Sequence, residues 1–254
     1  MPRHDDPAYP GCPVTVTDAI ADGVQLRPAR WDIVDIVVML VITAGLAICG
    51  GAFLRAVGAP LPVVVIVGGL LGWIGLAGWP LVVTARRGNG PRIDLGLILR
   101  WSDVRAGVGW GLLALAAAGI VGLVLVRLIG PFQSAAGEVG EQLIADGDRW
   151  ALLVFGAMIL IGAPIVEELA FRGLVFGVVR KRGASVLWTV VISAVAFALV
   201  HAEPTRIPVL LAIGLVLGAV RARTGSTGAS MVAHAVVNAP GAVLLVLGLP
   251  GMTP

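Results

Sequence analysis

Two adjacent carboxylates, Glu167 and Glu168, follow the apolar stretch LLVFGAMILIGAPIV. A charged side chain at the centre of a membrane helix costs about 2.5–3.5 kcal/mol, so each one needs a reason. Arg172 follows Glu168 by one helical turn and lies on the same face, where it can hold Glu168 ionised. Glu167 has the apolar Phe171 at the same spacing and stays less solvated. This difference predicts that Glu168 is a structural acid and Glu167 a catalytic base.

Two histidines follow the glutamates in apolar segments, each with a partner one turn away. Phe197 and His201 lie in FALVH, and His234 and Asn238 lie in HAVVN. Ionisable groups inside a membrane protein are functional by default. We therefore expect Glu167, Glu168, Arg172, His201, His234 and Asn238 to form one site.

The segments EELAFRG (167–173), FALVH and HAVVN resemble the three motifs of the CPBP family of membrane endopeptidases, the Rce-type or ABI group that includes CAAX proteases. The resemblance covers roughly residues 150–245. It implies an intramembrane endopeptidase that works on the cytoplasmic side of the membrane. In that family pattern Glu167 activates water with help from His201, and His234 and Asn238 stabilise the oxyanion. Glu168 and Arg172 form a structural pair. Amide hydrolysis needs these two functions, a base for water and donors for the developing charge.

The participation of a metal stays open at this stage. Glu167, His201 and His234 are the candidate ligands, since zinc accepts carboxylate oxygen and histidine nitrogen. The sequence lacks HExxH, in which one helix presents two histidines and the base. The family is described both as zinc-dependent and as using a metal-free glutamate mechanism, and the sequence favours neither.

The composition indicates the class of protein that holds these residues. Apolar residues make up 58% of the chain and charged residues 13%, and the mean hydropathy is +0.97. Soluble domains carry about 25% charged residues, so this chain is expected in a lipid bilayer. Although the pI is near 9.5, the basic residues lie between apolar runs and not in one patch, which argues against nucleic-acid binding.

We predict an all-α fold, a polytopic transmembrane helical bundle of about seven helices. Residues 1–30 are predicted as a disordered cytoplasmic tail and 31–149 as transmembrane helices with an external loop over 128–149. A short amphipathic helix at 91–102 is expected to lie at the membrane interface. Residues 150–249 are predicted as the catalytic core. The expected helices cover residues 31–54, 60–84, 106–127, 150–179, 184–201, 207–220 and 230–249.

The basic residues predict the orientation. The tail, the 85–105 loop, the 172–182 segment and the 221–229 loop hold 14 of the 18 lysines and arginines. Cytoplasmic loops carry such an excess, so we predict a multi-pass protein of the cell membrane with a cytoplasmic N-terminus.

The depth of His201 conflicts with straight helices. A helix that starts near residue 184 places His201 about 25 Å along its axis, deeper than the glutamates. Tilted helices, or a 184–220 hairpin that does not fully cross, would remove the conflict. In the hairpin, HAEPTR is a bend that lines a cavity, because irregular backbone at this depth must be buried or face water.

Two other functions compete with proteolysis by a membrane-associated protein or peptide substrate. One is a non-catalytic membrane scaffold or immunity factor with the same fold. The other is a proton-coupled transporter, which also uses buried Glu and His residues. The sequence identifies neither the substrate nor a prenyl-binding pocket.

Overall fold

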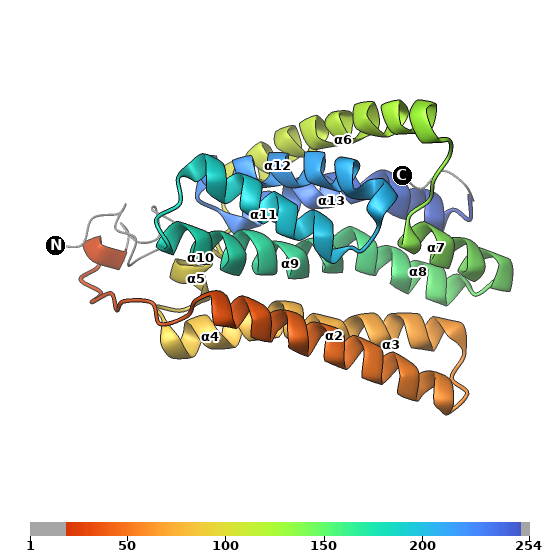
Figure 1. Ribbon diagram of the computed structural model, residues 1–254, viewed down its shortest axis with the longest axis horizontal. Coiled ribbons are helices and arrows are strands. Elements are labelled where there is room, and N and C mark those ends of the chain that lie inside the picture. Colours follow the sequence, from red (N-terminus) through yellow and green to blue (C-terminus); the bar gives the residue numbers. More distant parts are fainter. Residues whose placement is uncertain (1–18, 250–254) are drawn as a thin grey trace.

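The computed structural model describes residues 19–249, and every element of regular secondary structure within this range is a helix (Figure 1). The prediction of an all-α membrane bundle is confirmed. The helices are, in chain order, α2 (Ile33–Ala56), α3 (Leu61–Trp73), η1 (Ile74–Gly78), α4 (Trp79–Arg87), α5 (Pro91–Asp94), α6 (Trp101–Ile129), α7 (Ala135–Asp146), α8 (Arg149–Ala157), η2 (Met158–Gly162), α9 (Ala163–Glu168), η3 (Leu169–Val175), α10 (Phe176–Lys181), α11 (Val186–Val200), η4 (Pro204–Arg206), α12 (Ile207–Thr224) and α13 (Thr227–Val246).

Six helical stretches of the described chain are long and apolar enough to cross a membrane, so the chain is a multi-pass membrane protein. Two of them, Leu61–Arg87 and Arg149–Lys181, continue through the π-helical turns η1, η2 and η3. Pro80 and Pro164 follow η1 and η2, and proline, which lacks an N–H, disturbs the hydrogen bonding of the preceding turn. The seven predicted helices are all present, and the seventh, α11, is a shorter apolar helix of 15 residues.

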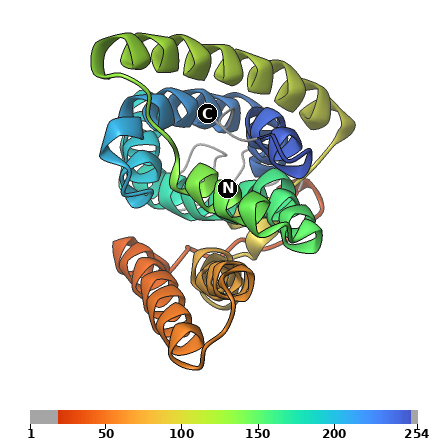
Figure 2. The same cartoon turned by 90° about the vertical axis from the view of Figure 1, so that its right-hand side faces the viewer.

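The bundle has two parts. Helices α11, α12 and α13 pack around the long Arg149–Lys181 helix, and α6 packs on the outer side of α12 and α13. Helices α2 and α3 form a pair on the other side of the long helix (Figure 2). Helices α6 and α13 approach closely through glycines. A Cβ atom at Gly107 would lie 2.6 Å from Cβ of Val232, and one at Gly111 would lie 2.6 Å from Cβ of Val236. The absence of a side chain at these two glycines therefore lets α6 and α13 pack closely.

The prediction of an interfacial helix at 91–102 is largely wrong. Only Pro91–Asp94 is helical, and the chain from Leu95 to Arg100 is irregular. The start of α13 binds this irregular segment: Oγ1 of Thr227 donates to the Leu95 carbonyl at 2.5 Å, and Oγ of Ser226 donates to the Ile98 carbonyl at 2.8 Å. Asp94, Leu95 and Gly96 are buried, whereas Leu99 and Arg100 are exposed, so only the first part of the segment lies in the bundle's interior.

The segments predicted as an external loop and as a disordered tail also contain ordered structure. The 128–149 loop holds α7, which begins at the N-cap Ser134 and ends at Gly147 in the left-handed conformation, φ 70°. Of the predicted tail, residues 1–18 lie outside the described residues. Residues 27–30 are bound to the bundle, in contrast to the predicted disorder. Arg30 N–H donates to the Arg87 carbonyl at 2.8 Å, and Nζ of Lys181 donates to the Ala29 carbonyl at 2.7 Å.

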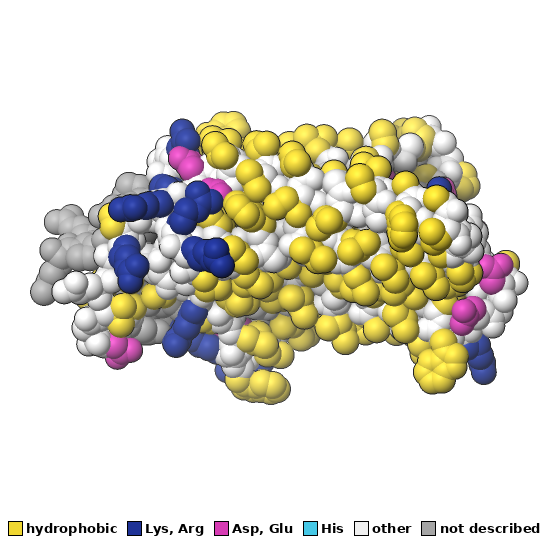
Figure 3. All heavy atoms as spheres, turned by 90° about the horizontal axis from the view of Figure 1, so that it is seen from below, with side chains coloured by type: hydrophobic (Ala, Val, Ile, Leu, Met, Phe, Trp, Pro, Cys, Tyr) yellow, Lys and Arg dark blue, Asp and Glu magenta, His cyan; other side chains and the backbone are white. Residues whose placement is uncertain are grey.

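Charged residues gather at the two ends of the bundle, with an apolar surface between them (Figure 3). We call the end at which α4, α10 and α12 finish the basic end, and the end that holds α7 the far end (Figure 1). The basic end carries, among others, Arg86, Arg87, Arg180, Lys181 and Arg182. Arg172, counted above with this group, instead lies fully buried within the helix.

Candidate active site

Glu168 and Arg172 form a buried ion pair inside the long helix. Glu168 ends α9, and Arg172 lies in the π-helical turn η3 that follows. Neither side chain has exposed surface, and Nη1 of Arg172 donates to Oε1 of Glu168 at 2.8 Å. Nη2 of Arg172 also donates to the carbonyl of Gly214 in α12 at 3.1 Å. The pair predicted from the sequence is present, and it joins two helices.

His234 of α13 links the two glutamates. Its Nδ1 lies 2.9 Å from Oε1 of Glu168, and its Nε2 lies 3.8 Å from Oε2 of Glu167. A carboxylate oxygen accepts hydrogen bonds, so Nδ1 is the donor, and the tautomer is assigned from this partner. In the singly protonated ring, the lone pair of Nε2 then faces Glu167.

His201 approaches Glu167 from α11 in the same manner. It is the C-cap of α11, and its Nδ1 lies 2.7 Å from the carbonyl oxygen of Phe197. A carbonyl can only accept, so Nδ1 carries the hydrogen. Nε2 of His201 lies 3.9 Å from Oε2 of Glu167. Both histidines therefore present Nε2 to one carboxylate oxygen.

Phe197 holds these side chains in place. Its ring makes edge contacts with His201 and His234, at centroid distances of 4.7 and 5.7 Å. Cζ of Arg172 lies 4.5 Å from the centroid of the same ring. The aromatic residue of FALVH thus packs against members of all three motifs.

Asn238 is oriented by a backbone carbonyl that the π-helical turn η2 leaves without its usual partner. The N–H of Ala163 bonds to the Met158 carbonyl, and Pro164 has no N–H to offer. Nδ2 of Asn238 donates to the carbonyl of Ile159 at 2.9 Å. The second hydrogen of this amide remains for another acceptor.

Residues 149–240 match the family described as Type II CAAX prenyl endopeptidase Rce1-like. All six candidate side chains and the three motifs lie within this range. This match covers 92 of the 254 residues, and we call residues 149–240 the Rce1-like domain. It is also 26% identical over 150 residues to YdiL of Bacillus subtilis (strain 168), a protein provisionally named a membrane peptidase. That similarity covers 59% of this chain and 57% of the relative, so the chain spans little more than half of its length. No solved structure matches the chain.

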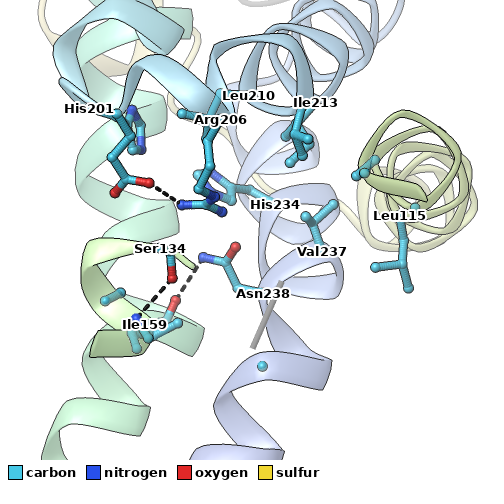
Figure 4. Close-up of a pocket in the computed structure, with 18 of the residues that line it drawn as sticks. Leu115, Ser134, Ile159, His201, Arg206, Leu210, Ile213, His234, Val237 and Asn238 are labelled. Carbon is cyan, nitrogen blue, oxygen red and sulfur yellow. Dashed lines mark hydrogen bonds and ion pairs between the residues drawn. The ribbon is translucent and has the colours of Figure 1, made fainter. Parts of the chain in front are cut away.

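The Rce1-like domain encloses a cavity of about 560 Å³ together with the distal half of α6. Figure 4 shows His201, Arg206, His234 and Asn238 grouped at its wall. Glu167 also lines the cavity, whereas Glu168 and Arg172 are buried behind it. Four of the six predicted residues therefore contact the cavity, and the other two support them from the interior.

The bend between α11 and α12 adds charged residues that the sequence analysis did not assign to the site. Glu203 and Arg206 line the cavity, and Nη1 of Arg206 donates to Oε2 of Glu203 at 2.6 Å. Oε1 of Glu203 accepts from the N–H of Ala135 at 3.3 Å, which ties the bend to the start of α7. Two charges three residues apart between apolar helices were the signal available in the sequence.

The short length of α11 accounts for the depth of His201, and because Pro204–Thr224 is long enough to cross a membrane, a 184–220 hairpin that does not fully cross stays a prediction. Helix α11 is not among the membrane-spanning stretches, and the bend after it stops short of the outer turns of α7 and α8 (Figure 1). His201 therefore lies level with Glu167, within reach of its carboxylate. The HAEPTR bend lines the cavity, as the hairpin hypothesis predicted.

Three side chains at the cavity are the candidates for binding a metal ion. Glu167, His201 and His234 carry atom types that zinc accepts, at about 2.0–2.2 Å from the ion. Among residues 19–249, however, no three His, Cys, Asp or Glu side chains are grouped so that they could hold a metal ion. The catalytic steps proposed below use only side chains and water.

Proposed function

We propose that the Rce1-like domain hydrolyses peptide bonds of membrane-associated proteins or peptides, with Glu167 as the general base. The observation that carries this proposal is the position of Oε2 of Glu167, which lies 3.8 and 3.9 Å from the Nε2 atoms of His234 and His201. These distances exceed a direct hydrogen bond and suit one bridging water. A hydrolytic water is thus expected beside a carboxylate at the wall of a cavity.

In the proposed reaction, Glu167 removes one proton from this water, while the other hydrogen stays on the oxygen and donates a hydrogen bond to Nε2 of His201. The oxygen attacks the substrate carbonyl, and a tetrahedral oxyanion forms. Nδ2 of Asn238 donates its second hydrogen to the oxyanion, and His234 contributes when Nε2 carries a proton. The oxyanion then collapses and the C–N bond breaks as Glu167 gives its proton to the leaving amine, so the water is divided between the two products.

Glu168 and Arg172 act as positioning residues in this scheme. Through Nδ1 of His234 and the carbonyl of Gly214 they fix α13 and α12 against the long helix. A proton relay would need titratable groups in series across the membrane. The six residues instead converge at one end of a cavity, which favours a reaction centre over transport.

Purified protein in lipid, incubated with a library of membrane-embedded reporter peptides, tests the proposal. Wild type is expected to cleave, and Glu167→Gln and His201→Ala are expected to lose cleavage. Glu138→Gln, on the exposed face of α7, is the matched control and should cleave like wild type. Assays with a chelator, and with added zinc, show whether a metal takes part. Cleavage by Glu167→Gln at the wild-type rate would reject the mechanism, and an unchanged cellular phenotype in that variant would favour a scaffold.

A further inference from the structure

The cavity extends from the catalytic residues in one direction only. Its lining from the long helix consists of Ile159, Ala163 and Glu167, which run from the glutamate towards the far end. From α13 it includes residues between His234 and Leu245, again towards the far end. The α6 lining begins at Leu115, in the half of that helix nearer α7. No lining residue of these three helices lies nearer the basic end than Glu167, His234 and Leu115.

Between the two glutamates and the basic end, the described side chains are packed tightly. The helix from Glu168 to Val178 is buried without interruption, and it includes the bulky side chains of Phe171 and Arg172. The end of α5 and the residues after it, Asp94–Gly96, pack against it, and a Cβ at Gly173 would lie 3.2 Å from Cβ of Leu95. Glu167 is about 21 Å of helix from Lys181, and packed side chains fill this distance.

At the far end the lining reaches α7, which lies outside the membrane-spanning stretches. Ala136 of α7 lines the cavity and is exposed, whereas Leu123 and Val126 line it from the membrane-spanning helix α6. The ion pair of Glu203 and Arg206 lies on the same side, and charged groups at membrane depth are tolerated where they meet water. Hydrolysis requires water at Glu167, and on this side the cavity reaches exposed surface of α7 outside the membrane-spanning stretches.

We propose that water and the substrate reach Glu167 from the far end, the side of the membrane opposite the basic loops. If the basic loops are cytoplasmic, as their charge predicts, the substrate is a membrane-associated polypeptide whose cleavage segment lies on the extracytoplasmic side. This differs from the cytoplasmic action that the family resemblance implied. The inference about the side of the membrane on which the substrate lies rests on the proposed protease function. The inference about the route by which water reaches Glu167 does not.

Thiol labelling in sealed vesicles of both orientations tests the route. With Cys12 and Cys49 replaced by serine, single cysteines are placed on either side of Glu167 in the same helix, as Ala163→Cys and Ala170→Cys. Ala163 lines the cavity, and Ala170 has no exposed surface. Arg92→Cys marks the basic end and Glu138→Cys the far end, since both residues are exposed. The probe is a small, charged, membrane-impermeant methanethiosulfonate.

Ala163→Cys is expected to react from the side that labels Glu138→Cys, and to lose this reaction from the side that labels Arg92→Cys. Ala170→Cys should be protected from both sides. Reaction of Ala163→Cys from the Arg92 side would overturn the proposal. So would its protection from both sides, which would mean access through the lipid. Should Ala163→Cys fold poorly, Gly122→Cys replaces it, because a Cβ there meets no atom within 4 Å.

Reporter proteins that expose the same cleavable segment on one side of the membrane or the other supply the functional half of the test. Cleavage is expected only for the segment on the Glu138 side. Cleavage from the Arg92 side alone would overturn the proposed side. If Ala163→Cys labels as expected and neither reporter is cleaved, the proteolytic function fails while the access route stands.

Discussion

Nδ1 of His234 lies 2.9 Å from Oε1 of Glu168, which makes the second glutamate the partner of a histidine 66 positions further along the chain. The same oxygen accepts Nη1 of Arg172 at 2.8 Å. Glu168 is therefore more than the local partner of Arg172 that the helical spacing predicts. It sets which nitrogen of His234 carries hydrogen, and so which one faces Glu167.

Replacement of Glu168 by glutamine should destabilise the protein as well as inactivate it. The change leaves the fully buried guanidinium of Arg172 without its counter-charge, and breaking a buried pair typically costs about 3–5 kcal/mol of folding free energy. Thermal unfolding in detergent measures the effect. Asp32→Asn, which breaks the exposed pair of Asp32 and Arg182, is the matched control and should shift the melting temperature much less. Equal shifts for the two variants would argue against a structural role of the buried pair.

Replacement of Asn238 by alanine should lower kcat by about 10²–10³, the usual loss for one oxyanion donor, with little change in KM. Asn238→Asp should be no better, because a carboxylate has no hydrogen to give to an oxyanion or to the Ile159 carbonyl. Steady-state cleavage of the reporter peptide provides both constants. A rise in KM at constant kcat would instead assign Asn238 to substrate binding.

The sequence predicted the residues of the site better than their arrangement. Glu168 and Arg172 are one turn apart, so helical geometry alone brings them together. The approach of His201 to Glu167 depends on the short length of α11 and the bend after it, which an apolar run does not specify. The orientation of Asn238 depends on a π-helical turn. Only Pro164 marks that turn in the sequence, and proline alone does not predict its form.

The segment after Asp94 shows a different limit of sequence reasoning. Alternating polar and apolar residues at 91–102 favour a helix on the membrane surface. Two hydroxyl groups more than 120 positions later, on Ser226 and Thr227, bind its carbonyls and hold it against the bundle. Such long-range partners compete with local pattern and leave no local signal.

Gly111→Val should destabilise the bundle, because a Cβ at this position would lie 2.6 Å from Cβ of Val236 and 2.7 Å from the Ala233 carbonyl. Overpacking of this kind costs about 1–3 kcal/mol. Gly109, on the same helix, meets no atom within 4 Å, so Gly109→Ala should instead stabilise by about 0.5–1 kcal/mol through helix propensity. Thermal unfolding of the two variants compares them. Stabilisation by both would show that α6 and α13 are not in close contact.

Asp94 should make stability depend on pH. Burial raises the pKa of its carboxyl above the ordinary value of 3.8, although Trp31 and Asn89 donate hydrogen bonds to it. A raised pKa in the folded state means that the folded protein binds the proton more tightly than the unfolded chain. Stability is then greatest below pH 3.8 and falls as the pH rises from there through the raised pKa.

Asp94→Asn removes this titration, so its melting temperature relative to wild type should rise with pH across the same interval. Melting temperatures of the two proteins between about pH 4 and about pH 7 provide the test. A difference that stays constant, or that falls with pH, would mean that the carboxyl is not more easily protonated in the folded state.

A bulky residue on the cavity wall of α6 should block cleavage without disturbing the fold. Gly119 lines the cavity, and a Cβ there meets no atom within 4 Å, so Gly119→Trp can be accommodated by filling the space that a substrate would occupy. Gly109→Trp is the matched control, since Gly109 is equally open but lies outside the cavity lining. Gly119→Trp is expected to raise KM strongly and Gly109→Trp to leave it unchanged, with similar melting temperatures. Equal kinetics for both would place substrate binding away from α6, and an equal loss of activity in both would point to a general sensitivity of that helix.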